Sequence, residues 1–265
     1  MYSAIARARS EGERVFFVGF ADLWEVFPSG TKVGARIPLS RNWWWLWDVV
    51  ERLIRVASVA RITRLLQLNS TGTALERTPG LTPITLFDGG YCQDPSLLDT
   101  TAIADLRLNR TESLSPGITF FVHVRRGDYL SHPSKEYPAA IAHTWFTHHI
   151  TKLGKRFPGA RFLVFSDDVE YCHKHFSTLE RVSVIDAPLS DSFHAMSHCD
   201  GGILSASSLS WWAAYLASTH SAGPFIAPRY WIRWPESRWD DPGIEKSDFL
   251  EWAVVPQGSS DAHEA

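Results

Sequence analysis

The sequence predicts an α/β fold in which the second half of the chain forms a parallel β-sheet covered by helices. From Ile118 onward, short apolar runs alternate with helical patterns four times, as in sheets built from repeated strand–helix units. The stretch 112–117 is typical of a linker, and 265 residues allow two domains, so we divide the chain into 1–115 and 116–265. Polar side chains gather where the predicted strands of the second half end, and ligands bind at such ends in open α/β sheets.

The elements of the first half follow a less regular pattern. An amphipathic stretch near the start predicts a helix, an apolar run predicts a strand, and a long helical pattern precedes a stretch rich in Thr, Gly and Pro. We therefore expect helix 2–10, strand 15–18, helix 41–68, a loop at 69–83 and a turn-rich segment at 87–94.

The predicted helix 41–68 opens with four tryptophans, at positions 43, 44, 45 and 47, and it also carries several arginines. Three interpretations are open. The helix packs on its domain with the tryptophans in the core, or it lies in a membrane interface through 42–68, since Trp and Arg suit the headgroup region. The third is an aromatic surface for sugar rings, and the sequence does not separate the three.

The second half is predicted in more detail, because its strands are short, apolar and rich in β-branched and aromatic residues. Ser134 is a candidate N-cap for the first helix, and Asp167 and Asp168 stand at the start of the second. The expected strands are 118–124, 161–165, 182–185, 202–204 and 225–227, and the expected helices are 137–153, 166–176, 191–197 and 209–217.

Composition excludes several classes of protein. A net charge of −3 and a pI of about 6.4 argue against a nucleic-acid-binding protein, which needs a basic face. Cys92, Cys172 and Cys199 have no paired spacing, so we expect neither a disulfide framework nor a zinc site. No apolar run approaches the roughly 20 residues of a membrane span. The start of the chain does not resemble a secretion signal, so we expect a cytoplasmic protein, peripheral to a membrane if 42–68 is interfacial.

The most informative stretch is 119–129, read as TFFVHVRRGDY. A buried strand ends here in Arg125, Arg126, Gly127 and Asp128, and two adjacent arginines repel each other unless an anion lies beside them. A guanidinium binds phosphate oxygens in a bidentate manner and keeps its charge. The stretch therefore predicts a phosphate site at a strand end. The alternative is a pair of surface arginines in a loop, salt-bridged to Asp128.

Two other strand ends carry polar groups. Ser207 and Ser208 begin a predicted helix, where free N–H groups and the helix dipole favour an anion, although the serines could simply cap the helix. Asp167 and Asp168 could cap a helix or accept hydrogen bonds from a base or a ribose. Paired acidic residues also suggest a metal, but no second acidic cluster lies at a helpful spacing, so we expect no metal.

These residues carry a family resemblance. His123 to Asp128 resembles the HxRRxD motif of the α1,2-fucosyltransferases, glycosyltransferase family eleven. Phe165 to Asp168 resembles that family's FSDD segment, and Ser207 to Ala214 is similar to its SSFSWWAA segment. Phe193 to Cys199 and Gly89 to Asp94 resemble two further segments, in the right order and spacing. HxRRxD alone would be shared with other fucosyltransferases, and the SWWAA segment points to the α1,2 family.

The resemblance implies a GT-B-like fold of two Rossmann-type halves and an inverting glycosyltransferase without a metal cofactor. It would move L-fucose from GDP-β-L-fucose to a galactoside hydroxyl of a glycan, in an α1,2 linkage. Residues 1–115 would form the acceptor side, and 116–265 would bind GDP-fucose. The expected partners are GDP-fucose and a glycan acceptor with terminal galactose, with no nucleic acid.

The resemblance also implies roles for particular residues. Arg125 and Arg126 would neutralise the departing diphosphate, as a divalent ion does in metal-dependent transferases. Asp128 is the first candidate for the base that deprotonates the acceptor, Glu136 is the second, and Asp128 could instead only orient Arg125. The implied substrate-binding residues, which would hold the nucleoside or cradle the phosphates, are His123, Asp167, Asp168, Ser207, Ser208 and Ser210.

One departure from the family pattern concerns the start of the chain. Family members begin with a glycine-rich GNQxF-type segment just before the helix that here starts at Met1, so we expect 1–115 to lack its first strand and glycine-rich turn. A second hypothesis follows from this departure: the chain is a GDP-sugar-binding protein without turnover, a truncated or degenerate transferase.

Overall fold

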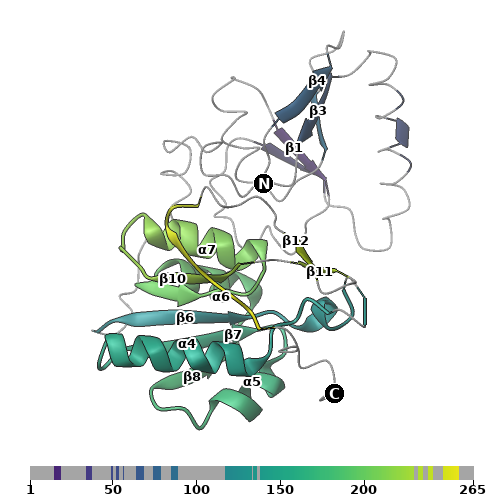
Figure 1. The fold of residues 1–265 in the computed structure, drawn as a ribbon. Coiled ribbons are helices and arrows are strands. Elements are labelled where there is room, and N and C mark those ends of the chain that lie inside the picture. Colours follow the sequence, from purple (N-terminus) through teal and green to yellow (C-terminus); the bar gives the residue numbers. More distant parts are fainter. Residues whose placement is uncertain are drawn as a thin grey trace. The chain divides into compact units, whose positions relative to one another are not determined.

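The structure is a computed structural model of the 265-residue chain, and it describes one part of the chain in full (Figure 1). Residues 117–132, 134–135, 138–229 and 247–256 are described with their side chains, as are four helical residues at 49, 52, 53 and 56. Elsewhere only the backbones of seven short strands are described. The chain divides into two compact units, 1–108 with 243–246 and 109–242 with 247–265. The predicted boundary at 115/116 falls outside the described residues.

The first unit contains two small sheets. Strand β1 (Val15–Val18) pairs in parallel with β2 (Gly34–Ile37). Strand β3 (Arg64–Leu68) pairs antiparallel with β4 (Ala74–Thr78) and parallel with β5 (Thr85–Asp88). The strand predicted at 15–18 is therefore confirmed.

Two sequence predictions in this unit are wrong in part. The helix predicted over 41–68 does not reach its last five residues, because 64–68 form β3, and the loop predicted at 69–83 contains β4. Leucines in 64–68 continue the helical spacing and favour helices, but pairing with a strand on each side decides their conformation.

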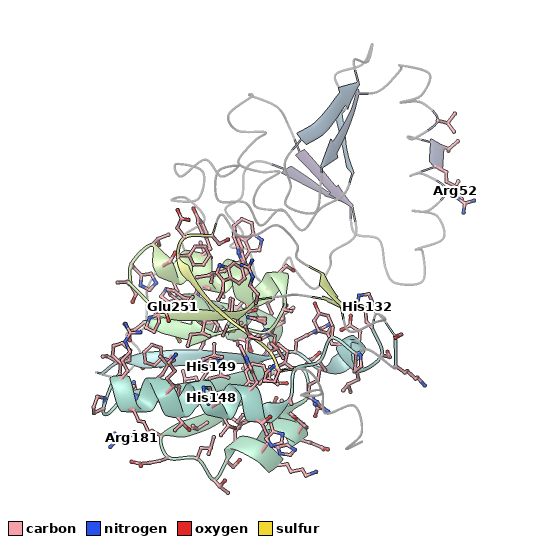
Figure 2. The ribbon with its side chains drawn as sticks, in the orientation of Figure 1. Arg52, His132, His148, His149, Arg181 and Glu251 are labelled. Carbon is pink, nitrogen blue, oxygen red and sulfur yellow. The ribbon has the colours of Figure 1, made fainter. Side chains whose placement is uncertain are left out.

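In the part of this segment before β3, the four described residues are helical and exposed. Val49, Leu53 and Val56 are each at least 45% exposed, and Arg52, labelled in Figure 2, is also exposed. The four tryptophans at 43–47 lie outside the described residues, as does the helix predicted at 2–10. None of the helices among the described residues has the length and apolarity to cross a bilayer.

The second unit is built on a six-stranded sheet in the order β13-β10-β9-β6-β7-β8, in which every pair of neighbours is parallel. This confirms the predicted α/β class and the parallel sheet, and β13 was the strand that the sequence did not predict. The strands are β6 (Thr119–Val124), β7 (Arg161–Ser166), β8 (Val182–Ile185), β9 (Gly201–Ile203), β10 (Phe225–Pro228) and β13 (Leu250–Ala253). A separate antiparallel pair is formed by β11 (Ile232–Trp234) and β12 (Arg238–Asp240).

Helices connect these strands, as predicted (Figure 1). They are α4 (His143–Arg156), α5 (Val169–Phe176), α6 (Leu189–Ser197) and α7 (Ser208–Ser218), and a 3₁₀ turn, η4 (Gly127–Leu130), follows β6. Three of the four helices begin within three residues of the predicted start, which is close to the usual spread of assigned ends.

Helix α4 begins six residues later than predicted, so the prediction of its start, with Ser134 as N-cap, is wrong. The N-cap is Ala142, and the apolar residues before it are extended and buried. The N–H of Ala139 donates to the carbonyl of His132, and that of Ala140 to the carbonyl of Tyr129. These bonds, one to η4 and one to the residue two positions after it, take the place of the first helical turn.

The core lies on both faces of the sheet because side chains of β6 alternate in direction. Phe120, Val122 and Val124 belong to a cluster with the buried faces of α4 and α5. Phe121 points to the other face, where its ring centroid lies 6.4 Å from that of Phe225. The central strand is thus buried on both sides, and the residues that follow it leave the sheet at its carboxyl edge.

Helix α7 covers the second face with aromatic side chains. Trp211 is fully buried, stacks on Tyr215, and contacts Phe249 edge-on. Its indole N–H donates to the hydroxyl of Ser247 at 3.1 Å. Trp211 and Trp212 are therefore core residues of the second unit.

Candidate functional site

The carboxyl ends of three adjacent strands bring the predicted polar residues together. In the register of the sheet, Val124 of β6 lies opposite Ser166 of β7, and Val122 lies opposite Ile203 of β9. The strands therefore end at the same edge, and the segments 125–128, 167–168 and 205–208 leave it side by side. The sequence alone predicted this gathering, and the structure confirms it.

Three ion pairs hold the two arginines. The guanidinium of Arg125 donates from Nη2 to Oδ1 of Asp128 at 2.6 Å and from Nη1 to Oδ2 of Asp167 at 2.8 Å. Nε of Arg126 lies 3.1 Å from Oδ2 of Asp168. The anions beside the two arginines are therefore carboxylates of the protein, and the salt bridge to Asp128 that the alternative interpretation expected is present.

The two arginines differ in their exposure and in their contacts. Arg126 is 4% exposed, its guanidinium carbon lies 3.4 Å from the centre of the Tyr171 ring, and its backbone N–H donates to Asp167 at 2.8 Å. The side chain of Arg125 is 35% exposed, and the centre of the Tyr129 ring lies 5.6 Å from its guanidinium carbon. Arg126 is thus buried and held by several contacts, whereas Arg125 is partly exposed.

The turn after β6 is shaped by Gly127 and Ser166. Gly127 has a φ of +20°, and a Cβ there would collide with Oδ2 of Asp167. The hydroxyl of Ser166 donates to the carbonyl of Val124 at 2.7 Å and accepts the N–H of Asp168 at 2.9 Å. These contacts bring the aspartates that follow β7 within reach of the arginines that follow β6.

Asp168 has two functions in this geometry. Besides binding Arg126, its side chain accepts the backbone N–H of Tyr171 at 3.0 Å as the N-cap of α5. The capping interpretation is therefore confirmed for Asp168. Asp167 instead binds the backbone N–H of Arg126 and the side chain of Arg125.

The segment after β9 is held by Ser205, which the sequence analysis missed. Its hydroxyl donates to the carbonyl of His123 at 2.7 Å and accepts the N–H of Arg125 at 2.8 Å. Ser205 is buried, so it joins the ends of β6 and β9 from inside. Its place at a strand end, two residues before Ser207, was a signal that could have been used.

The three predicted serines have different surroundings. Ser207 is the N-cap of α7, but its side chain makes no capping hydrogen bond, and Ser208 is partly exposed. Ser210 is fully buried, and its hydroxyl donates to the carbonyls of Ser205 and Ser207. The expected substrate-binding role of Ser210 is therefore corrected, because its hydroxyl is used inside the protein to hold the turn.

His123 is buried beneath the arginines. Its pKa is lowered to about 3, first because burial penalises the charged imidazole and second because Arg125 repels it. Its Nδ1 has no hydrogen-bond partner among the described residues. A neutral imidazole with an unused nitrogen can donate or accept one hydrogen bond, depending on its tautomer.

Asp128 is the most exposed carboxylate of the cluster, with 64% of its side chain accessible. One of its oxygens is bound to Arg125, which is the contact expected if Asp128 orients that arginine. Glu136, the second candidate base, lies outside the described residues. Among the described residues, no group of three or more His, Cys, Asp or Glu side chains is arranged to hold a metal ion.

Comparison with known proteins gives several similarities. A family model described as Glycosyl transferase family 11 matches residues 98–236. The chain is similar to an alpha-1,2-colitosyltransferase of Escherichia coli, with 33% identity over 155 residues that cover 56% of this chain and 51% of that protein. It is also similar to galactoside alpha-(1,2)-fucosyltransferase 1 of Sus scrofa, with 30% identity over 122 residues, 43% of this chain and 33% of that protein. The chain thus spans about half the length of the first relative and a third of the second.

Among solved structures, the chain is similar to the fucosyltransferase NodZ from Bradyrhizobium. The two share 13% sequence identity with a TM-score of 0.43, over 82% of this chain and 86% of that one. The family model covers more than half of the 265 residues and contains every predicted site residue, in agreement with the resemblance of the motifs. The chain belongs to glycosyl transferase family 11.

Proposed function

We propose that this protein is an inverting glycosyltransferase that moves L-fucose from GDP-β-L-fucose to a galactoside hydroxyl of a glycan, forming an α1,2 linkage. Membership in family 11 supports glycosyl transfer, and the names of the curated relatives support the α1,2 linkage. The observation that carries the proposal is the pair of arginines, one fixed and one facing outward, at the carboxyl edge of the parallel sheet.

The arginines bind the diphosphate of the donor. Charge develops on GDP as the bond to fucose breaks, and preorganised N–H donors aimed at that charge stabilise the transition state. Arg125, Arg126 and their three aspartates carry a formal charge of +2 − 3 = −1. Arg125 therefore exchanges one of its carboxylates for phosphate oxygens when the donor binds, while Arg126 keeps its place.

The remaining groups at this edge complete the donor site. The hydroxyls of Ser207 and Ser208, together with the free N–H groups at the start of α7, donate to phosphate oxygens. His123 and the aspartates of β7 hold the nucleoside or the diphosphate, and the unused Nδ1 of His123 supports this assignment. We assign donor binding to 116–265 and acceptor binding to 1–115.

Asp128 accepts the proton of the acceptor hydroxyl as the new bond forms. Its exposure places a carboxylate where an incoming sugar can reach it. Inversion follows if the hydroxyl attacks the anomeric carbon from the side opposite the departing GDP. No divalent ion takes part in this proposal, because the arginines supply the positive charge.

A transfer screen tests the proposal. Labelled GDP-fucose is incubated with the chain and a panel of β-galactoside acceptors, with and without EDTA, and the linkage of any product is determined. A colitosyl donor forms a second arm, because one relative is a colitosyltransferase. Arg125→Ala is the matched negative control.

The outcomes separate the alternatives. An α1,2-fucosylated product that forms in EDTA and disappears with Arg125→Ala supports the proposal. Binding of GDP-fucose without transfer to any acceptor would instead identify a GDP-sugar-binding protein. Loss of activity in EDTA, with recovery on adding Mg²⁺ or Mn²⁺, would overturn the assignment of the arginines in place of a metal.

A further inference from the structure

We propose that Tyr171 is a positioning residue for Arg126: its ring sets the plane of the guanidinium that the donor diphosphate meets. This inference rests on the proposed function, because it assumes that Arg126 binds the diphosphate. Tyr171 itself does not contact the donor in this account, and it acts only through Arg126.

The contacts of Arg126 support this role. Its guanidinium carbon lies 3.4 Å from the centre of the Tyr171 ring, and its Nε lies 3.1 Å from Asp168. The ring fixes the plane of the guanidinium, and the carboxylate fixes its rotation within that plane. Because Arg126 is only 4% exposed, water screens neither contact well, and cation–π attraction is strongest in such places.

Tyr171 is itself held at both ends. Its backbone N–H donates to Oδ1 of Asp168, the same residue whose Oδ2 binds Arg126. Its hydroxyl accepts the backbone N–H of His143, the first residue of α4, at 3.2 Å. The side of the ring is also packed against His175, with 4.4 Å between the ring centres. The first turn of α5 and the start of α4 therefore fix the ring that carries the arginine.

The neighbouring arginine provides a comparison within the same motif. Arg125 has a tyrosine ring, Tyr129, only at 5.6 Å, and its position is set by two carboxylates instead. A ligand phosphate competes with carboxylates for a guanidinium, but it does not compete with a ring on the guanidinium face. The stack on Tyr171 can therefore persist when the donor binds.

Two substitutions separate the ring from the hydroxyl. Tyr171→Phe keeps the ring and removes the hydroxyl, and it should change the affinity for GDP less than about threefold, since the stack remains. Tyr171→Leu keeps an apolar side chain and removes the ring, and it should weaken GDP binding about tenfold. GDP affinity is measured by calorimetry, beside guanosine and a melting curve for each variant.

A matched control lies on α7. Tyr215→Leu also removes a partly buried tyrosine that stacks on an aromatic neighbour, Trp211, but it touches neither arginine. It should lower the melting temperature and leave GDP affinity unchanged. If Tyr171→Leu and Tyr215→Leu weakened GDP binding equally, the effect would be general destabilisation and the proposal would be overturned.

Pentafluorophenylalanine at position 171 keeps the test decisive if Tyr171→Leu does not fold. This residue preserves the size of phenylalanine and reverses the charge distribution of the ring, so GDP should bind more weakly than to Tyr171→Phe. Equal GDP affinity in these two variants would overturn the proposal. Failure of the unmodified protein to bind GDP would instead reject the proposed function, so the two failures are distinguishable.

Discussion

Replacing Arg126 with alanine should destabilise the unliganded protein much more than replacing Arg125. Arg126 is buried, and its removal loses a desolvated stack on Tyr171 worth about 2 kcal/mol. It also leaves Asp168, two-thirds buried, without its cation, at a cost of about 1–2 kcal/mol. Arg125 is itself 35% exposed, one of its two partners, Asp128, is 64% exposed, and ion pairs of such exposed groups contribute about 0–1 kcal/mol. The expected loss in the free energy of unfolding is therefore roughly 3–4 kcal/mol for Arg126→Ala and about 1 kcal/mol for Arg125→Ala.

Urea unfolding of the two alanine variants and the unmodified protein measures this difference directly. In transfer assays both variants should lose about 10²–10³ in kcat, the usual cost of removing one donor to developing charge. Lysine at 125 should restore transfer only in part, because an ammonium cannot reproduce the bidentate fork. Equal losses of stability at the two positions, or near-normal transfer by either variant, would refute the assignment of one fixed and one outward-facing arginine.

Three further predictions follow from individual side chains. Asp128→Asn should raise GDP affinity severalfold, because it releases Arg125, and calorimetry checks this affinity. If the same variant loses transfer activity by about 10²-fold or more, Asp128 is the base. Unchanged transfer activity would leave Asp128 only the role of orienting Arg125. Ser208→Ala should weaken the binding of GDP more than the binding of guanosine. Ser210→Ala should instead lower the free energy of unfolding by about 1 kcal/mol and change GDP binding little. A loss of GDP affinity in Ser210→Ala with none in Ser208→Ala would contradict these roles. His149, labelled on α4 in Figure 2, has its pKa lowered to about 4, mainly by burial, so its contribution to stability is complete above pH 6.5 and is lost as pH falls toward 4. His149→Leu should therefore flatten the decline of stability by about 1.4 kcal/mol per pH unit in that window, and an unchanged slope in urea unfolding would contradict the lowered pKa.

Much of the second unit could be predicted from the sequence, because its central strands β6, β9 and β10 are short and buried, and several strands end abruptly in polar groups. The chain order of β6, β7 and β9 and the parallel rule place Arg125, Asp167 and Ser207 at one edge without any coordinates. The family motifs lie at these strand ends, so the resemblance and the physical pattern pointed to the same residues.

The start of α4 could not be predicted in this way. The apolar residues before it suit a helix, but Pro138 has no N–H, and the N–H groups of Ala139 and Ala140 bond to the carbonyl of His132 and to that of Tyr129 in η4. The helix predicted for residues 64–68 was wrong for a similar reason, since pairing with β4 and β5 outweighs the local helix propensity.

The partners within the site depend on register and were also beyond prediction from sequence. Nothing in the sequence indicates that Asp167 binds Arg125 while Asp168 binds Arg126. Nor does it indicate that the ring of Tyr171 lies against the guanidinium of Arg126. Those pairings reverse one expectation. Repulsion between two adjacent arginines, taken alone, would make the removal of one of them stabilising, whereas with the carboxylate partners present we expect its removal to be destabilising.

Titration calorimetry with GDP and guanosine, in EDTA, tests the central claim most directly. The claim is that Arg125 and Arg126 at the carboxyl edge of the sheet form a diphosphate site. The unmodified protein should bind GDP about 100-fold more tightly than guanosine, since each charge-assisted contact contributes about 1.5–3 kcal/mol. Arg125→Ala, folded by its melting curve, should lose most of that difference and keep its affinity for guanosine. Equal affinities for GDP and guanosine in the unmodified protein, or an undiminished preference for GDP in Arg125→Ala, would contradict the account.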